Sequence, residues 1–162
     1  MRHIKKELRK HERPLEQLRN RLLERLQLPV VGHEDAPNFQ LSEPQNAGNL
    51  PPECSGPAFR TARCSEFTVT GHSGNNCIMI DGHVVVVERF RHLKTSKEPC
   101  VIGQEFCGKE EFYTVPFESS RMGIFAVSKL SATKVWPLRN VKKMLLLPLA
   151  DQFVVFPEMH TC

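Results

Sequence analysis

Residues 76–90 read NCIMIDGHVVVVERF and carry the strongest fold signal in the chain. Two runs rich in β-forming residues flank Asp81-Gly82. Asp-Gly is the pair that a two-residue type I′ turn prefers, because both central residues of that turn need a positive φ. The stretch therefore predicts a β-hairpin built from residues 76–80 and 83–90.

Outward from this hairpin, further short segments have the composition of strands. They recur at roughly ten-residue spacing with turn residues between them, which is typical of a barrel or a sandwich. The segments are 65–70, 100–106, 123–128, 134–136, 144–147 and 152–156. Residues 137–143 resemble one short helical turn opened by a proline. We predict a mainly β fold, with a small antiparallel β-barrel over residues 59–162.

Residues 29–58 differ sharply in composition from the rest of the chain. They hold six prolines, three glycines, no basic residue and a net charge of −4, with no apolar period. Such a segment buries too little apolar surface to offset the entropy of ordering it. We therefore predict a disordered, acidic, proline-rich linker over residues 29–58.

Residues 1–28 predict a basic amphipathic helix with a net charge of +5. Its apolar stripe is formed by Leu15, Leu18, Leu22 and Leu26. A lone helix of this length is marginal in water, so the stripe needs a partner: the C-terminal domain or a second copy of the helix, which would mean self-association. The alternative use is a nucleic-acid or nuclear-import patch made of Lys5, Lys6, Arg9 and Lys10.

The C-terminal part resembles a known family. Residues 99–148 are similar to the bromo-adjacent-homology (BAH) module, and residues 77–90 fit its opening hairpin. A similar module occurs in transposon-derived animal reading frames with a "YxxPxxSSxxGIxxVSxL…WPL" pattern. The residues that carry the resemblance are Phe112, Tyr113, Pro116, Ser119, Ser120, Gly123, Ile124, Phe125, Val127, Ser128, Leu130, Trp136, Pro137, Leu138, Val141, Lys143, Pro157 and His160. The resemblance implies a BAH-like β-barrel and a chromatin-associated, transposon-derived protein.

Catalytic and metal-binding patterns are absent from the sequence. The six cysteines form no Cys-x-x-Cys pair, the seven histidines have no metal-ligand spacing, and no phosphate-binding glycine loop occurs. The carboxylates give no acid–base pair. We therefore expect a protein that is not an enzyme, with no catalytic residue, no cofactor and no metal.

Candidate binding residues fall into two groups. The first group consists of large aromatic residues, namely Phe112, Tyr113 and Trp136. Aromatic rings of this kind form the cages of methyl-lysine readers. The alternative is that Tyr113 and Trp136 pack at the mouth of the barrel. Basic side chains gather in two runs that could face phosphates, namely Arg89, Arg91, Lys94 and Lys97, and Arg139, Lys142 and Lys143.

Two hypotheses of function follow. The first is a non-catalytic protein-interaction module whose partner is a protein or peptide. The second is an accessory nucleic-acid-binding protein that contacts phosphates through its basic helix and its Lys/Arg runs, without reading bases. The chain has no apolar run long enough to cross a bilayer, and its first residues lack the apolar core of a secretion signal. We expect no membrane partner and an intracellular, nuclear location.

Overall fold

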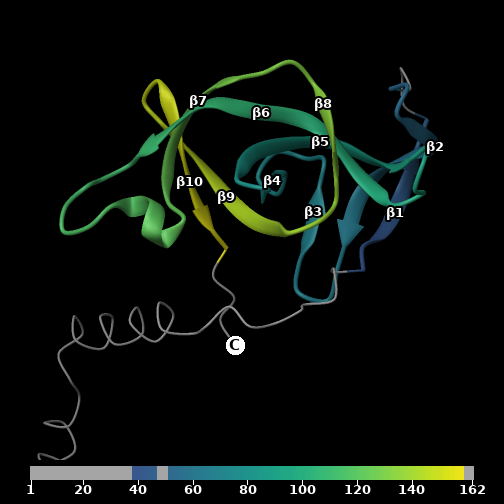
Figure 1. Cartoon of the computed structure of the whole chain (residues 1–162), viewed down its shortest axis with the longest axis horizontal. Helices are drawn as coiled ribbons and strands as arrows, with labels where there is room; N and C mark the ends of the chain where they lie inside the picture. Colours follow the sequence, from purple (N-terminus) through teal and green to yellow (C-terminus); the bar gives the residue numbers. More distant parts are fainter. Residues whose placement is uncertain (1–37, 47–50, 159–162) are drawn as a thin grey trace, which may run out of the picture. The chain divides into compact units, whose positions relative to one another are not determined.

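The structure is a computed structural model that describes residues 38–46 and 51–158. These residues form ten strands and one short 3₁₀ helix (Figure 1). The strands are β1 (Gln40–Gln45), β2 (Cys54–Arg63), β3 (Thr68–Thr70), β4 (Cys77–Ile80), β5 (His83–Leu93), β6 (Pro99–Glu111), β7 (Phe125–Leu130), β8 (Lys134–Pro137), β9 (Val141–Leu149) and β10 (Gln152–Pro157), and the helix is η1 (Ser119–Met122). No helix within the described ranges is long and apolar enough to cross a membrane.

All the strand pairs are antiparallel, and six strands close into a ring. The pairing order is β5, β4, β9, β10, β7 and β6, and β6 pairs back with β5. The other four strands are attached outside this ring: β2 joins β5, β1 and β3 both join β2, and β8 joins β6. The prediction of a mainly β, antiparallel fold is confirmed, in the form of one sheet with a ring of strands.

The hairpin predicted from residues 76–90 is confirmed as β4 and β5. Asp81 has a φ of 48° and Gly82 a φ of 84°, so both turn residues adopt the positive values that the sequence predicts. The register pairs Ile80 with His83 directly across the turn. The turn therefore sets which residues of the two strands face each other.

Both faces of the β4–β5 hairpin are buried, which explains the unbroken run of four valines. Val84 belongs to a core cluster with Phe106, Val127 and Val155, which come from the ring strands. Val85 belongs to the other large cluster, which includes Phe90 and extends to β1, β2 and β3. A strand covered on both faces needs apolar residues at every position rather than at alternate ones.

A substitution at Gly82 should weaken this hairpin. We expect Gly82→Val to lower the free energy of unfolding by more than about 1 kcal/mol, because a β-branched residue is strained at positive φ. A Cβ at Gly82 would meet no atom within 4 Å, so the cost comes from the backbone conformation alone. Urea unfolding would measure it, with Gly82→Asn as the control that tolerates positive φ. Equal midpoints for Gly82→Val and the wild type would contradict the turn assignment.

Two expectations about the chain's organisation are wrong. Part of the predicted linker is folded: β1 lies inside residues 29–58 and pairs with β2, and β2 itself begins at Cys54. β1 is an edge strand that pairs only with β2 among the described strands, and Leu41 is its one residue packed against the core cluster, so the segment has no apolar alternation. Residues 137–143 form no helical turn; β8 ends at Pro137, β9 begins at Val141, and Asn140 between them has a φ of 50°. The predicted helix of residues 1–28 lies outside the described residues.

Candidate functional site

The segment of residues 112–124, called here the β6–β7 loop, extends away from the strands that it connects (Figure 1). It contains two of the three aromatic residues singled out from the sequence, Phe112 and Tyr113. The Tyr113 ring makes edge contacts with Phe112 and Phe117, with ring centroids 6.2 Å apart in both pairs. The loop thus carries its own small aromatic cluster.

Trp136, the third aromatic candidate, is elsewhere. It lies on β8 opposite Val101 of β6 and packs against the core cluster that contains Phe90. Glu111, the last residue of β6 before the loop, is ten positions beyond Val101. At about 3.3 Å per residue this is about 33 Å along the strand. The three residues therefore do not form one aromatic cage. Only Phe112 and Tyr113 share a surface.

One buried hydroxyl organises the β6–β7 loop. The Ser119 side chain is fully buried, and its Oγ accepts a hydrogen bond from the backbone N–H of Phe112 at 2.8 Å. The same oxygen lies 2.9 Å from Glu111 Oε2 and 2.9 Å from the carbonyl oxygen of Ile124. These contacts connect the two ends of the loop to its middle, so the loop has hydrogen bonds of its own in addition to the two strands that flank it.

A carboxylate completes this network. The backbone N–H of Ser120 donates to Glu111 Oε2 at 2.7 Å, at the start of η1. Hydrogen bonds from Ser120, and then from Ser119, lower the pKa of the Glu111 carboxyl from its ordinary value, because they favour the charged form. The negative charge of Glu111 therefore helps to hold the loop together.

Acidification should loosen the β6–β7 loop. The pKa of Glu111 is lower in the folded protein than its ordinary value of 4.5, so the carboxylate's contribution is complete above about pH 4.5 and is lost as the pH falls through the lowered folded value. We expect the backbone amide signals of Phe112 and Ser120 to follow this titration in NMR spectra. Glu111→Gln should remove the pH dependence. A midpoint at or above 4.5 for these amides would contradict the network.

The outer part of the loop exposes apolar side chains. Val115 is 82% exposed and Phe112 is 44% exposed, while Ser119 beneath them is fully buried. Val115 and Ser119 are not among the functional candidates predicted from the sequence, although both lie within the motif around Tyr113 and Pro116. The loop therefore presents an apolar tip on an ordered base.

The two basic runs make mostly internal contacts. Arg91 is 4% exposed and donates to the carbonyl oxygen of Gly56 at 2.6 Å. Arg139 forms an ion pair with Glu98, and Lys143 forms one with Glu158 at 2.8 Å. Arg89 is partly exposed and lies 3.8 Å from Glu88. The other three residues are exposed: Lys97 donates to Ser55, Lys94 lies in the turn after β5, and Lys142 lies on β9. Lys5, Lys6, Arg9 and Lys10 lie outside the described residues.

The cysteines are mainly buried thiols. Cys54, Cys64, Cys77 and Cys100 are buried and unbridged, and Cys107 is exposed. Burial raises the pKa of both Cys77 and Cys100 to about 12, which disfavours the reactive thiolate. Among the residues that the structure describes, no three His, Cys, Asp or Glu side chains are grouped so as to hold a metal ion.

Comparison with known proteins places the folded part of the chain in a family. Searches of curated proteins and of solved structures gave no significant match. Residues 44–158 match the model of a family described as a domain of unknown function (DUF8592), and this match carries no identification with the bromo-adjacent-homology module. Since the match covers most of the chain and includes every strand from β2 to β10, the chain belongs to the DUF8592 family.

Proposed function

We propose that this domain is a non-catalytic protein-interaction module that docks a protein partner through the β6–β7 loop. The observation that carries the proposal is the 82% exposure of Val115 on the same loop as Phe112, which is 44% exposed, with the loop connected by the buried Ser119 hydroxyl. Apolar anchors of this kind supply much of the binding energy at protein interfaces. Because the loop is already ordered, docking incurs less conformational entropy cost.

The charges around the loop favour a partner of particular chemistry. Glu110 precedes the loop, Glu118 lies within it, and both are exposed. Within the described ranges neither carboxylate has an ion-pair partner. Arg121 of η1 is exposed as well, so the loop carries charges of both signs, and we expect the partner to offer an apolar pocket with a polar rim. The resemblance to bromo-adjacent-homology modules supports a nuclear, chromatin-associated partner.

The folded part of the chain offers few unpaired cations for the nucleic-acid hypothesis. A phosphate-binding surface needs cations that face solvent. Arg91 is buried, and Arg139 is exposed but ion-paired with Glu98. Among the described residues of the two runs, Lys94, Lys97 and Lys142 are exposed and form no ion pair. The described residues also hold nearly equal numbers of basic and acidic side chains. Phosphate binding would then depend on the basic residues before the folded domain, and the affinity would fall steeply with salt.

A comparative pull-down tests the interaction proposal. The full chain and its Val115→Asp variant are used as baits, each with and without nuclease, and the captured proteins are quantified. We expect at least one protein that the wild type captures with or without nuclease and that Val115→Asp loses, because a charge at the tip opposes burial in an apolar pocket. Val115 is so exposed that the substitution should leave the fold intact.

Leu147→Asp is the matched control. Leu147 is 53% exposed and lies on β9, outside the β6–β7 loop. This variant should capture the same proteins as the wild type. If Val115→Asp and Leu147→Asp capture identical sets of proteins, the loop is not the docking element. If every captured protein disappears after nuclease treatment, the nucleic-acid hypothesis is preferred.

A further inference from the structure

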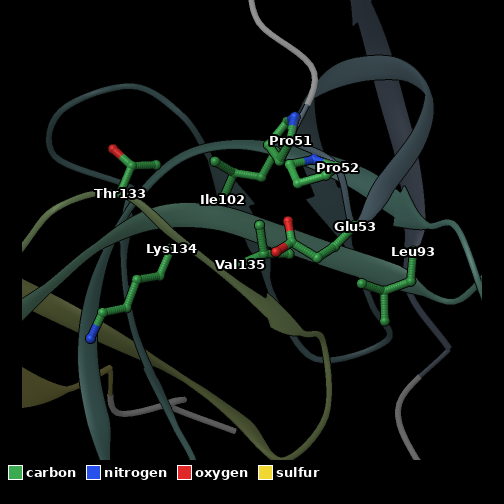
Figure 2. Close-up of a pocket in the computed structure, with 8 residues that line it drawn as sticks. All are labelled: Pro51, Pro52, Glu53, Leu93, Ile102, Thr133, Lys134 and Val135. Carbon is green, nitrogen blue, oxygen red and sulfur yellow. The ribbon is translucent and has the colours of Figure 1, made fainter.

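An open groove of about 570 Å³ lies on the sheet formed by β2, β5, β6 and β8 (Figure 2). Leu93 of β5, Ile102 of β6 and Val135 of β8 form its apolar floor, and Pro51 and Pro52 form one wall. Ile102 is 3% exposed and belongs to a buried cluster with Cys54 and Cys100. The floor is therefore part of the core and is fixed in shape before any ligand arrives.

One carboxylate faces this floor without a partner. Figure 2 shows the Glu53 side chain reaching from the Pro51–Pro52 wall toward Val135. The backbone of Glu53 is held in place, since its carbonyl oxygen accepts from the N–H of Lys94 at 2.8 Å. In the described part of the chain the Glu53 carboxylate has no ion-pair partner.

Lys134 is the one cation among the residues that line the groove, and it does not pair with Glu53. The amine of Lys134 points away from the groove and pairs with Glu105 (Figure 2). The groove thus combines an apolar floor with a single available negative charge. An aliphatic chain that ends in a cation matches this combination, and lysine and arginine side chains have that form.

The neighbouring strand β8 has an edge that can receive a peptide backbone. The N–H of Leu138 donates to the carbonyl oxygen of Pro99, one position beyond the last printed pair of β6 and β8, Cys100 with Pro137, and this bond sets the alternation of the ladder. Because hydrogen-bonded pairs alternate with non-bonded ones in an antiparallel ladder, the N–H and C=O of Val135 point away from β6. No strand pairs with that outer edge of β8 among the described residues. The side chain of Val135 lies in the groove beside this edge.

We propose that the groove binds an extended peptide through a lysine or arginine side chain. The aliphatic part of that side chain lies on Leu93, Ile102 and Val135, and its cation pairs with Glu53. The peptide backbone pairs with the outer edge of β8 at Val135, in the manner of β-strand addition. Pro137 ends β8 and limits this pairing to a few residues. The site is separate from the β6–β7 loop, whose first residue, Phe112, lies ten positions beyond Ile102.

An NMR titration with model peptides tests this site in the full chain. The probe is a blocked pentapeptide of alternating threonine and valine with a central lysine, and the matched probe has norleucine at the centre, which keeps the aliphatic stem and lacks the charge. We expect the lysine peptide to shift the methyl signals of Ile102 and Val135. The norleucine peptide should bind about fivefold more weakly.

Glu53→Gln distinguishes the ion pair from simple apolar contact. In this variant we expect the two peptides to bind equally, at the affinity of the norleucine peptide for the wild type. The control Glu66→Gln removes an exposed carboxylate between β2 and β3 and should leave the preference for lysine unchanged. The proposal is overturned if neither peptide shifts the groove methyl signals, or if Glu53→Gln retains the preference for lysine.

Discussion

We expect Phe90→Ala to lower the free energy of unfolding by about 4 kcal/mol, the loss typical of a large aromatic side chain removed from a core. Phe90 has no exposed surface and is among the largest fully buried side chains of the domain. It sits on β5 opposite Val101 of β6 and Phe59 of β2, so its ring packs where three strands meet. Its removal leaves a cavity that the surrounding strands cannot close without breaking their ladders.

Urea unfolding followed by circular dichroism measures this loss, and Phe112→Ala is the control. Phe112 is an aromatic residue of the same size that is 44% exposed on the β6–β7 loop, so its removal should cost about 1 kcal/mol or less. If the two variants have similar midpoints, Phe90 is not at the centre of the core and the register of β5 against β6 is wrong.

Gly103→Val is expected to be the most damaging substitution in the ladder that closes the ring, at about 3 kcal/mol or more. Gly103 lies on β6 opposite Val87, next to the irregularity in β5 between Val87 and Arg89. A Cβ at this position would overlap the carbonyl oxygen of Val86 and press on the Val85 side chain. Since the obstacle is backbone, β5 and β6 must separate locally to admit the side chain.

The unfolding temperatures of Gly103→Val and Gly74→Ala are compared, because the first variant reports the close approach of two strands and the second reports backbone strain alone. Gly74 has a φ of 89° and open space where a Cβ would be, so Gly74→Ala should cost only about 1 kcal/mol from the strained backbone. A Gly103→Val variant as stable as Gly74→Ala would show that β5 and β6 are not closely paired there, and the ring would then be open at this point.

The sequence predicts those strands whose own residues favour β structure and whose neighbouring residues require one type of turn. The β4–β5 hairpin could be predicted because Asp81-Gly82 requires one turn type and the valines before Glu88 favour strand. β1 could not, because Gln40–Gln45 is polar and its stability comes from pairing with β2, which is not a local property. The residues after Pro137 suggest a helix by composition, yet Val141 and the residues after it pair with β4 as part of β9, and Asn140, with its positive φ, turns the chain from β8 into β9.

The candidate site shows the same division between local and long-range effects. Phe112 and Tyr113 are adjacent in sequence, so their shared surface was predictable. The separation of Trp136 from them depends on where β8 pairs along β6, which no short motif encodes. The role of Ser119 was equally hidden, because a serine in a loop is ordinary until Glu111, Phe112 and Ile124 are found around its hydroxyl. The groove was missed because Glu53 and its neighbouring prolines belong to a segment of linker-like composition.

Site-specific photo-crosslinking at Val115 tests the central claim, docking through the β6–β7 loop, most directly. A photoreactive amino acid is placed at position 115 of the full chain in cells, and at Leu147 in a parallel experiment. We expect position 115 to crosslink to a discrete protein that position 147 does not reach, and we expect this product to disappear when Phe112 is also changed to serine. Crosslinking only to nucleic acid, or the same products from both positions, would contradict it.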